Sequence, residues 1–326
     1  MTIKVQELVK EFRRPKRKSG RFTALRTLFS HEYASTRAVD GVDFSIEPGE
    51  LIGYIGPNGA GKSTTIKMLT GILVPTSGTV EVAGVVPWRE RERNARQIGV
   101  VFGQRTGLWW DLPLRDSLEL VRPLYDLPRQ RFLANLETFA GMLGLDQFMD
   151  VPVRQLSLGQ RMRGDLAAAM LHEPQILYLD EPTVGLDIVA KRRIREFLSR
   201  LNRDAGTTVI LTTHDLDDVE ELCTRVILVD HGKVLYDGDV AELKRQHAPH
   251  HELIVHLAEP AFTADIPDVQ RTRREDGFVT LTFDPARIAA ADLISNVLAV
   301  HRVTDLSIVR PKLEDVVADI YAERSP

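Results

Sequence analysis

The alternation of apolar and polar positions divides this chain into short apolar runs separated by longer amphipathic stretches. Residues 3–9 and 39–46 are rich in β-branched residues and predict short strands. Five further runs are continuously apolar, which is typical of strands buried on both faces of a sheet. They span residues 51–56, 98–102, 176–180, 207–211 and 225–229. Residues 113–171 have a mostly helical pattern, so the sequence predicts a wound α/β core with a helical insertion.

The pattern breaks near residues 247–251, and a smaller α+β segment follows. It predicts strands at 251–257, 277–283 and 303–309 and helices at 286–299 and 312–323. We therefore expect one domain over residues 1–246 and an accessory α+β domain over 247–326.

Composition narrows the class of protein. The chain is 43% hydrophobic and 27% charged, with a net charge of −4 that argues against wholesale nucleic-acid binding. The single cysteine, Cys223, fits a reducing compartment. No apolar run reaches the roughly 18 residues that a membrane span needs, and the N-terminus lacks the apolar core of a signal peptide. These features predict a cytosolic protein that associates with a membrane only through a partner protein.

A basic tract over residues 10–26 interrupts the N-terminal strands. A solvated loop is the favoured interpretation. Contact with anionic lipid is the second, and nucleic-acid binding is a distant third.

The segment after the 51–56 run fits the phosphate-binding pattern G-x-x-x-x-G-K-[ST] between a strand and a helix. It consists of Gly56, Pro57, Asn58, Gly59, Ala60, Gly61, Lys62, Ser63 and Thr64. Glycines let backbone N–H groups converge on a polyanion, and the following helix directs its positive end toward it. We expect Lys62 to reach the β- and γ-phosphates of a bound nucleotide and Ser63 to ligate Mg²⁺.

Two carboxylates follow the apolar run at 176–180. Asp180 ends the run and Glu181 comes next, at the edge of a parallel sheet where ligands bind. Asp180 is predicted to hold Mg²⁺ and Glu181 to orient and deprotonate the attacking water.

These motifs and several others stand in the order and spacing of ABC ATPases, which the chain resembles over roughly residues 1–245. The further matching segments are Gln104, 156–160 (LSLGQ), 185–187 (GLD) and His214. The resemblance implies a P-loop NTPase cassette with a RecA-like core, an antiparallel β subdomain and a helical subdomain at about 105–172. The 156–160 segment is similar to the family signature, except that Leu158 replaces the usual glycine.

The resemblance also implies roles for these residues. Ser157, Gly159 and Gln160 of one subunit would close over the ATP of a second copy, and Asp187 would lie at the dimer seam. Ser157 opens an apolar helix, and a plain helix cap is the alternative interpretation of it. Gln104 would contact Mg²⁺, the attacking water and ATP, and His214 would hold the catalytic geometry near the γ-phosphate. Glu181, His214, Gln104 and Lys62 are thus the expected catalytic residues.

Two aromatic features are less directly placed. The residue that stacks on adenine is expected to be Phe12, with Tyr33 as the alternative. Trp109 and Trp110 lie where the resemblance places the groove for the membrane partner, although ordinary packing in the helical insertion is an equal alternative.

The resulting prediction is an ATPase subunit that dimerises around two ATP and drives export through separately encoded permease subunits, at the cytoplasmic face of the cell membrane. The tail at 311–321 (PKLEDVVADIY) is similar to that of ATPases serving drug, lipid or polysaccharide exporters, which implies a regulatory or dimer-stabilising role. The alternatives are an importer ATPase and a non-transport cassette of DNA repair or translation. The single P-loop and single cysteine disfavour the last of these.

Overall fold

A computed structural model describes residues 2–15, 33–103, 105–248, 250–258, 266–267, 269–275 and 278–322. The chain divides into two compact units, Met1–Gly238 and Asp239–Pro326. The division precedes helix α10 (Val240–His247), whereas the sequence pattern placed it just before the end of that helix.

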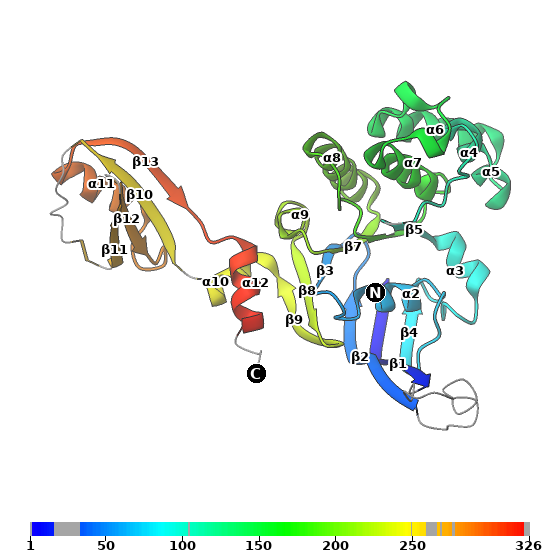
Figure 1. The fold of residues 1–326 in the computed structure, drawn as a ribbon, viewed down its shortest axis with the longest axis horizontal. Helices are drawn as coiled ribbons and strands as arrows, with labels where there is room; N and C mark the ends of the chain where they lie inside the picture. The colour runs from blue at the N-terminus through cyan, green and yellow to red at the C-terminus, as the bar shows by residue number, and fades with distance from the viewer. Residues whose placement is uncertain are drawn as a thin grey trace, which may run out of the picture. The chain divides into compact units, whose positions relative to one another are not determined.

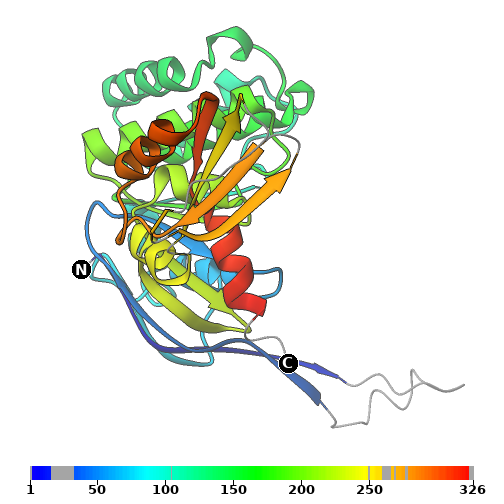
Figure 2. The same cartoon turned by 90° about the vertical axis from the view of Figure 1, so that its left-hand side faces the viewer.

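An antiparallel sheet opens the first unit. It contains β1 (Ile3–Pro15), β2 (Tyr33–Ile46) and β4 (Ser77–Val82) in the order β2-β1-β4. The first two strands run side by side well beyond the lengths that the sequence pattern predicts (Figure 2). Among the described side chains of β1, buried apolar residues such as Ile3 and Leu8 lie in its first half, and the part from Lys10 onward is mostly charged. The apolar pattern of the sequence therefore predicts only the buried parts of β1 and β2.

A second sheet of six strands has the order β5-β6-β7-β3-β8-β9 (Figure 1). Its strands are β3 (Leu51–Ile55), β5 (Ile98–Phe102), β6 (Ile176–Asp180), β7 (Thr208–Thr213), β8 (Arg225–Asp230) and β9 (Lys233–Asp239). The pairs from β5 through β8 are parallel, so the loops after β3, β6 and β7 all leave from the same edge of the sheet. The five apolar runs of the sequence are confirmed as buried strands of this sheet.

Helices complete the first unit. Those beside the sheets are α2 (Lys62–Leu69), α3 (Arg91–Gln97), α8 (Ile188–Ala205) and α9 (Leu216–Leu222). The helical insertion contains α4 (Leu114–Glu119), α5 (Val121–Leu124), α6 (Arg129–Leu143) and α7 (Leu158–Met170), with 3-10 turns at Asp146–Phe148 and Val153–Gln155. Figure 1 shows α4 to α7 gathered into one group. The helical subdomain expected at about 105–172 corresponds to this group.

The core of the first unit lies between the two sheets. Ile3 and Val5 of β1 belong to the same buried cluster as Tyr54 of β3, Met68 of α2 and Tyr178 of β6. Burial of large apolar side chains is worth about 1.5–3 kcal/mol each, so this cluster anchors the strand–loop–helix segment that follows β3.

The second unit is an antiparallel sheet with helices. Its elements besides α10 are β10 (His251–Leu257), β11 (Val269–Glu275), β12 (Phe278–Phe283), α11 (Ala290–Val300), β13 (Val303–Val309) and α12 (Leu313–Ala322). The strand order is β11-β12-β10-β13, and α11 packs Leu293 and Val297 against one face. Among the described residues, no helix has the length and apolarity that a membrane crossing requires.

Candidate functional site: a P-loop and two carboxylates at one sheet edge

The loop between β3 and α2 needs its glycines. Gly61 has φ of 102°, and a Cβ there would lie 2.2 Å from the Ala38 carbonyl oxygen. A Cβ on Gly56 would lie 2.2 Å from the Val229 carbonyl oxygen. Gly59, in contrast, has φ of 89° and open space where a side chain would be. The loop is thus packed tightly on its protein side and leaves its backbone accessible on the other, as a phosphate cradle requires.

Lys62 begins α2 and is only 6% exposed. Its Nζ donates to the carbonyl oxygens of Gly56 at 2.6 Å and Pro57 at 3.0 Å. Burial lowers the pKa of Lys62, while the nearby carboxylates of Glu181 and Asp180 raise it. The loop therefore holds a cation among carbonyl groups that phosphate oxygens can replace as partners.

Ser63 and Asp180 meet between α2 and the end of β6. Ser63 Oγ donates to Asp180 Oδ1 at 3.1 Å, and Thr212 Oγ1 of β7 donates to the same oxygen at 2.5 Å. A hydroxyl and a carboxylate are hard oxygen donors that fit Mg²⁺, which binds with one or two carboxylates plus phosphates and water. Among the described residues, no group of three His, Cys, Asp or Glu side chains is arranged to hold a metal ion.

Glu181 and His214 form a second pair at the same edge. His214 Nδ1 lies 3.3 Å from Glu181 Oε1. The Glu181 backbone has φ of 56°, a left-handed conformation that is uncommon outside glycine and costs about 1–3 kcal/mol. Its N–H donates to the Thr212 carbonyl oxygen at 2.9 Å. A strained backbone held by its neighbours directs this carboxylate toward the P-loop.

A pocket of about 370 Å³ joins these elements. Phe12, Thr36, Lys62, Ser63 and Glu181 line it together with other residues of the P-loop. The structure thus brings Phe12 of β1 to the P-loop, and Lys10 Nζ lies 5.4 Å from the centroid of its ring. The side chain of Tyr33 and all of Gln104 lie outside the described residues.

The signature segment lies elsewhere. Ser157 is the N-cap of α7, and its hydroxyl accepts from the Gln160 N–H at 3.2 Å while Gln160 Oε1 accepts from the Ser157 N–H at 2.8 Å. A Cβ on Gly159 would lie 2.9 Å from the Cβ of Ala190 on α8, so this position packs too closely for a side chain. None of these residues lines the P-loop pocket of the same chain. Ser157 is therefore a true helix cap.

Asp187 and the tryptophans are on the surface of the same unit. Asp187 caps α8, with Oδ1 accepting from the Ala190 N–H at 2.8 Å. Trp109 and Trp110 are 46% and 49% exposed, so neither is packed in a core. The Arg161 guanidinium lies 5.2 Å from the centroid of the Trp110 ring.

Some residues of the site were missed from the sequence. Thr212, whose hydroxyl donates to Asp180, lies in β7 directly after the apolar run at 207–211, where a threonine by itself indicates no function. Asp165 of α7 accepts from Thr106 Oγ1 and the Gly107 N–H, both at 2.9 Å, and so fixes the loop after β5. Nothing in the sequence of its helix indicates this contact, which only the tertiary structure reveals.

Comparison with known proteins decides the family. The sequence model described as "ABC transporter" matches residues 39–184. The ABC transporter ATP-binding protein NatA of Bacillus subtilis is 34% identical over 215 residues, which are 66% of this chain and 87% of NatA. This chain belongs to the ABC transporter ATP-binding proteins.

Other relatives agree with this assignment. The daunorubicin/doxorubicin resistance ATP-binding protein DrrA of Streptomyces peucetius is 38% identical over 65% of this chain and 64% of DrrA. Among solved structures, the dimeric post-hydrolysis state of the ATP-binding cassette MJ0796 bound to ADP and Pi is 25% identical. It has a TM-score of 0.61 and covers 73% of this chain and 98% of that one. The cassette fold and ATP hydrolysis expected from the sequence are therefore confirmed.

Proposed function

We propose that this ABC ATPase binds ATP with Mg²⁺ at the P-loop pocket and uses the closure of two copies to drive export through a separately encoded permease. The observation that carries the proposal is the convergence of two pairs, Ser63 with Asp180 and Glu181 with His214, around Lys62 at one sheet edge.

Each residue has a chemical role in this proposal. The P-loop N–H groups and Lys62 bind the β- and γ-phosphates, and Phe12 stacks on adenine. Ser63 and Asp180 would hold Mg²⁺, together with Gln104 as the family resemblance implies, and the ion would neutralise phosphate charge. Glu181 takes the proton of the attacking water, and His214 holds the Glu181 carboxylate in place.

A second copy of the chain supplies the signature residues that do not line the P-loop pocket of their own chain. Ser157, Gly159 and Gln160 stand at the N-terminus of α7, where free N–H groups favour the γ-phosphate of the other subunit's ATP. Ile188 and Val189, next to Asp187, are 84% and 73% exposed. Exposed neighbouring apolar residues are typical of a surface that another protein covers. The MJ0796 cassettes, which this chain resembles in fold, are themselves dimeric.

Export is favoured over import by the relatives. Besides DrrA they include the Nod factor export ATP-binding protein I of Ralstonia nicotianae, 35% identical over 65% of each chain. The exposed pair Trp109 and Trp110 is the proposed contact with the permease, which would hold the ATPase at the cytoplasmic face of the membrane.

Replacement of the proposed base tests the mechanism. Glu181→Gln should lower kcat by about 100-fold or more while ATP binding persists, because the amide cannot accept the proton. Size-exclusion chromatography with ATP should then show a trapped dimer. Glu137→Gln, at an exposed position on α6, is the matched control and should hydrolyse ATP normally. Undiminished turnover in Glu181→Gln would remove Glu181 as the base.

The transport claim has its own measurement. Purification from membranes of cells that also produce the permease should recover both chains, and inside-out vesicles should accumulate cargo when ATP is added outside. Loss of cargo from preloaded inside-out vesicles under ATP would indicate import instead.

A further inference from the structure

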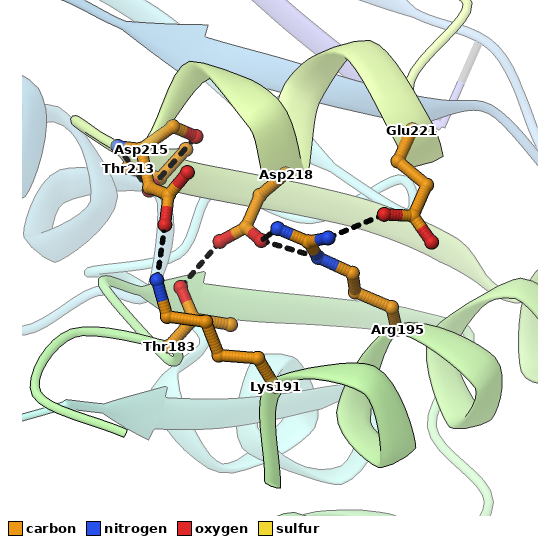
Figure 3. A network of polar contacts seen from close by, with 7 residues as sticks. All are labelled: Thr183, Lys191, Arg195, Thr213, Asp215, Asp218 and Glu221. Atoms are coloured by element: carbon orange, nitrogen blue, oxygen red, sulfur yellow. Dashed lines mark hydrogen bonds and ion pairs between the residues drawn. The ribbon is translucent and has the colours of Figure 1, made fainter. Parts of the chain in front are cut away.

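A network of polar contacts joins α8 and α9 to the loops that follow β6 and β7 (Figure 3). Its centre is Asp218 of α9, whose side chain is fully buried. Arg195 of α8 reaches it with Nε at 2.6 Å and Nη2 at 2.5 Å, and the buried hydroxyl of Thr183 donates to its other oxygen. Arg195 also pairs with Glu221 at the end of α9. The carboxylate of Asp218 thus ties α9 to α8 and to the loop after β6.

A second link joins α8 to the loop after β7. Lys191 Nζ contacts Asp215 Oδ2, and the Asp215 N–H donates to Thr213 Oγ1 at 2.9 Å. Lys191 and Arg195 are four residues apart and therefore share one face of α8. One face of α8 is therefore linked both to the loop after β6, which carries Glu181, and to the loop after β7, which carries His214.

The two anchored residues are close in sequence to the catalytic ones. Thr183 follows Glu181 by two residues, and Asp215 is the neighbour of His214. The Glu181 backbone has the left-handed φ of 56°, which persists only where the surroundings enforce it. Glu181 and His214 must also stay 3.3 Å apart although they leave from different strands.

Stability alone is a poor reason for such a network. The free-energy cost of removing two charges from water roughly cancels their Coulomb attraction. Apolar side chains at these positions would therefore stabilise the fold at least as well. A fully hydrogen-bonded buried carboxylate does, however, fix the relative geometry of the three segments that it joins.

We propose that Asp218, acting through Thr183 and Arg195, is a positioning residue for ATP hydrolysis. It sets the Glu181 loop against the His214 loop and connects both to α8, whose N-cap Asp187 is the expected seam residue. This inference rests on the proposed role of Glu181 as the base. It predicts that the network governs kcat and leaves ATP binding nearly unchanged, because none of its members lines the P-loop pocket.

The sharpest test removes one hydroxyl. Thr183→Val keeps the shape of the side chain and loses the bond to Asp218, whereas Thr183→Ser keeps the bond. We expect Thr183→Val to lower kcat by about tenfold with KM for ATP changed by less than about twofold, and Thr183→Ser to restore kcat. The control is Thr208→Val, which removes a buried hydroxyl that accepts from the Gly49 N–H at 2.9 Å at the other end of the sheet.

The outcomes separate the possibilities. Unchanged kcat in Thr183→Val, or the same loss in Thr208→Val at equal thermal stability, would overturn the positioning role. Asp218→Asn, measured in parallel for kcat, KM and unfolding temperature, should show the same selective fall in kcat. If Glu181→Gln still hydrolyses ATP, the proposed base is wrong; if it does not and Thr183→Val is silent, only the network proposal fails.

Discussion

His172, just after α7, is a buried histidine whose environment makes a quantitative prediction. It is only 9% exposed, and its ring stacks on Tyr125 with centroids 3.9 Å apart. Nε2 lies 3.0 Å from the Ile98 carbonyl oxygen, so this nitrogen carries the proton of the neutral ring. Nδ1 is buried without a partner among the described atoms. Protonation would bury an N–H donor and a charge with nothing to receive them, and burial accordingly lowers the pKa of His172 to about 4.

The sign of the effect on stability follows from that shift. The unfolded chain takes up the proton near pH 6.5 and the folded protein only near pH 4. Acidification therefore favours the unfolded state, and His172 lowers the free energy of unfolding as pH falls from about 6.5 to about 4. Between pH 7 and pH 5 the two pKa values correspond to a loss of about 2 kcal/mol in the free energy of unfolding.

The perturbation is His172→Gln, which keeps an N–H donor but does not titrate. Urea unfolding followed by tryptophan fluorescence reports on the first unit alone, because Trp88, Trp109 and Trp110 are the three tryptophans of the chain. The wild type should lose about 2 kcal/mol more than His172→Gln between pH 7 and pH 5. His231→Gln, at an exposed position of the first unit, should match the wild type. Equal pH dependence of wild type and His172→Gln would refute the reasoning.

Two further predictions concern Asp165 and Phe12. Burial raises the pKa of Asp165 to about 6, so the folded state holds this proton more tightly than the unfolded state. The wild type should therefore gain about 1 kcal/mol relative to Asp165→Asn as pH falls from 7 to 5, in the same urea assay, and an identical profile of the two proteins would contradict this. Phe12→Ala should raise KM for ATP by about fivefold with kcat nearly unchanged, since aromatic stacking on a base is worth about 1–3 kcal/mol, whereas Phe12→Tyr should bind normally. An unaltered KM in Phe12→Ala would leave adenine to another residue.

The strands missed from the sequence show where apolar patterns carry little information. β4, β9 and β11 each lie at one edge of a sheet, and each is largely exposed or polar, as in the VQRTRRE of β11. Edge strands need few buried side chains, so their sequences resemble those of loops. Inside the six-stranded sheet, β3, β6, β7 and β8 are largely buried and were predicted from their apolar runs.

The sequence by itself determined the local chemistry. The glycines and Lys62 of the P-loop, the carboxylates of Asp180 and Glu181 and the cap at Ser157 are specified within a few residues, because strand–loop–helix geometry and helix capping are local properties. Tertiary structure decided which residues from distant parts of the chain are in contact. The strand order β6-β7-β3 puts Thr212 on Asp180, and the packing of α8 on α9 puts Arg195 on Asp218. Such contacts join residues distant in the chain, and their energies depend on burial, which only the folded chain creates.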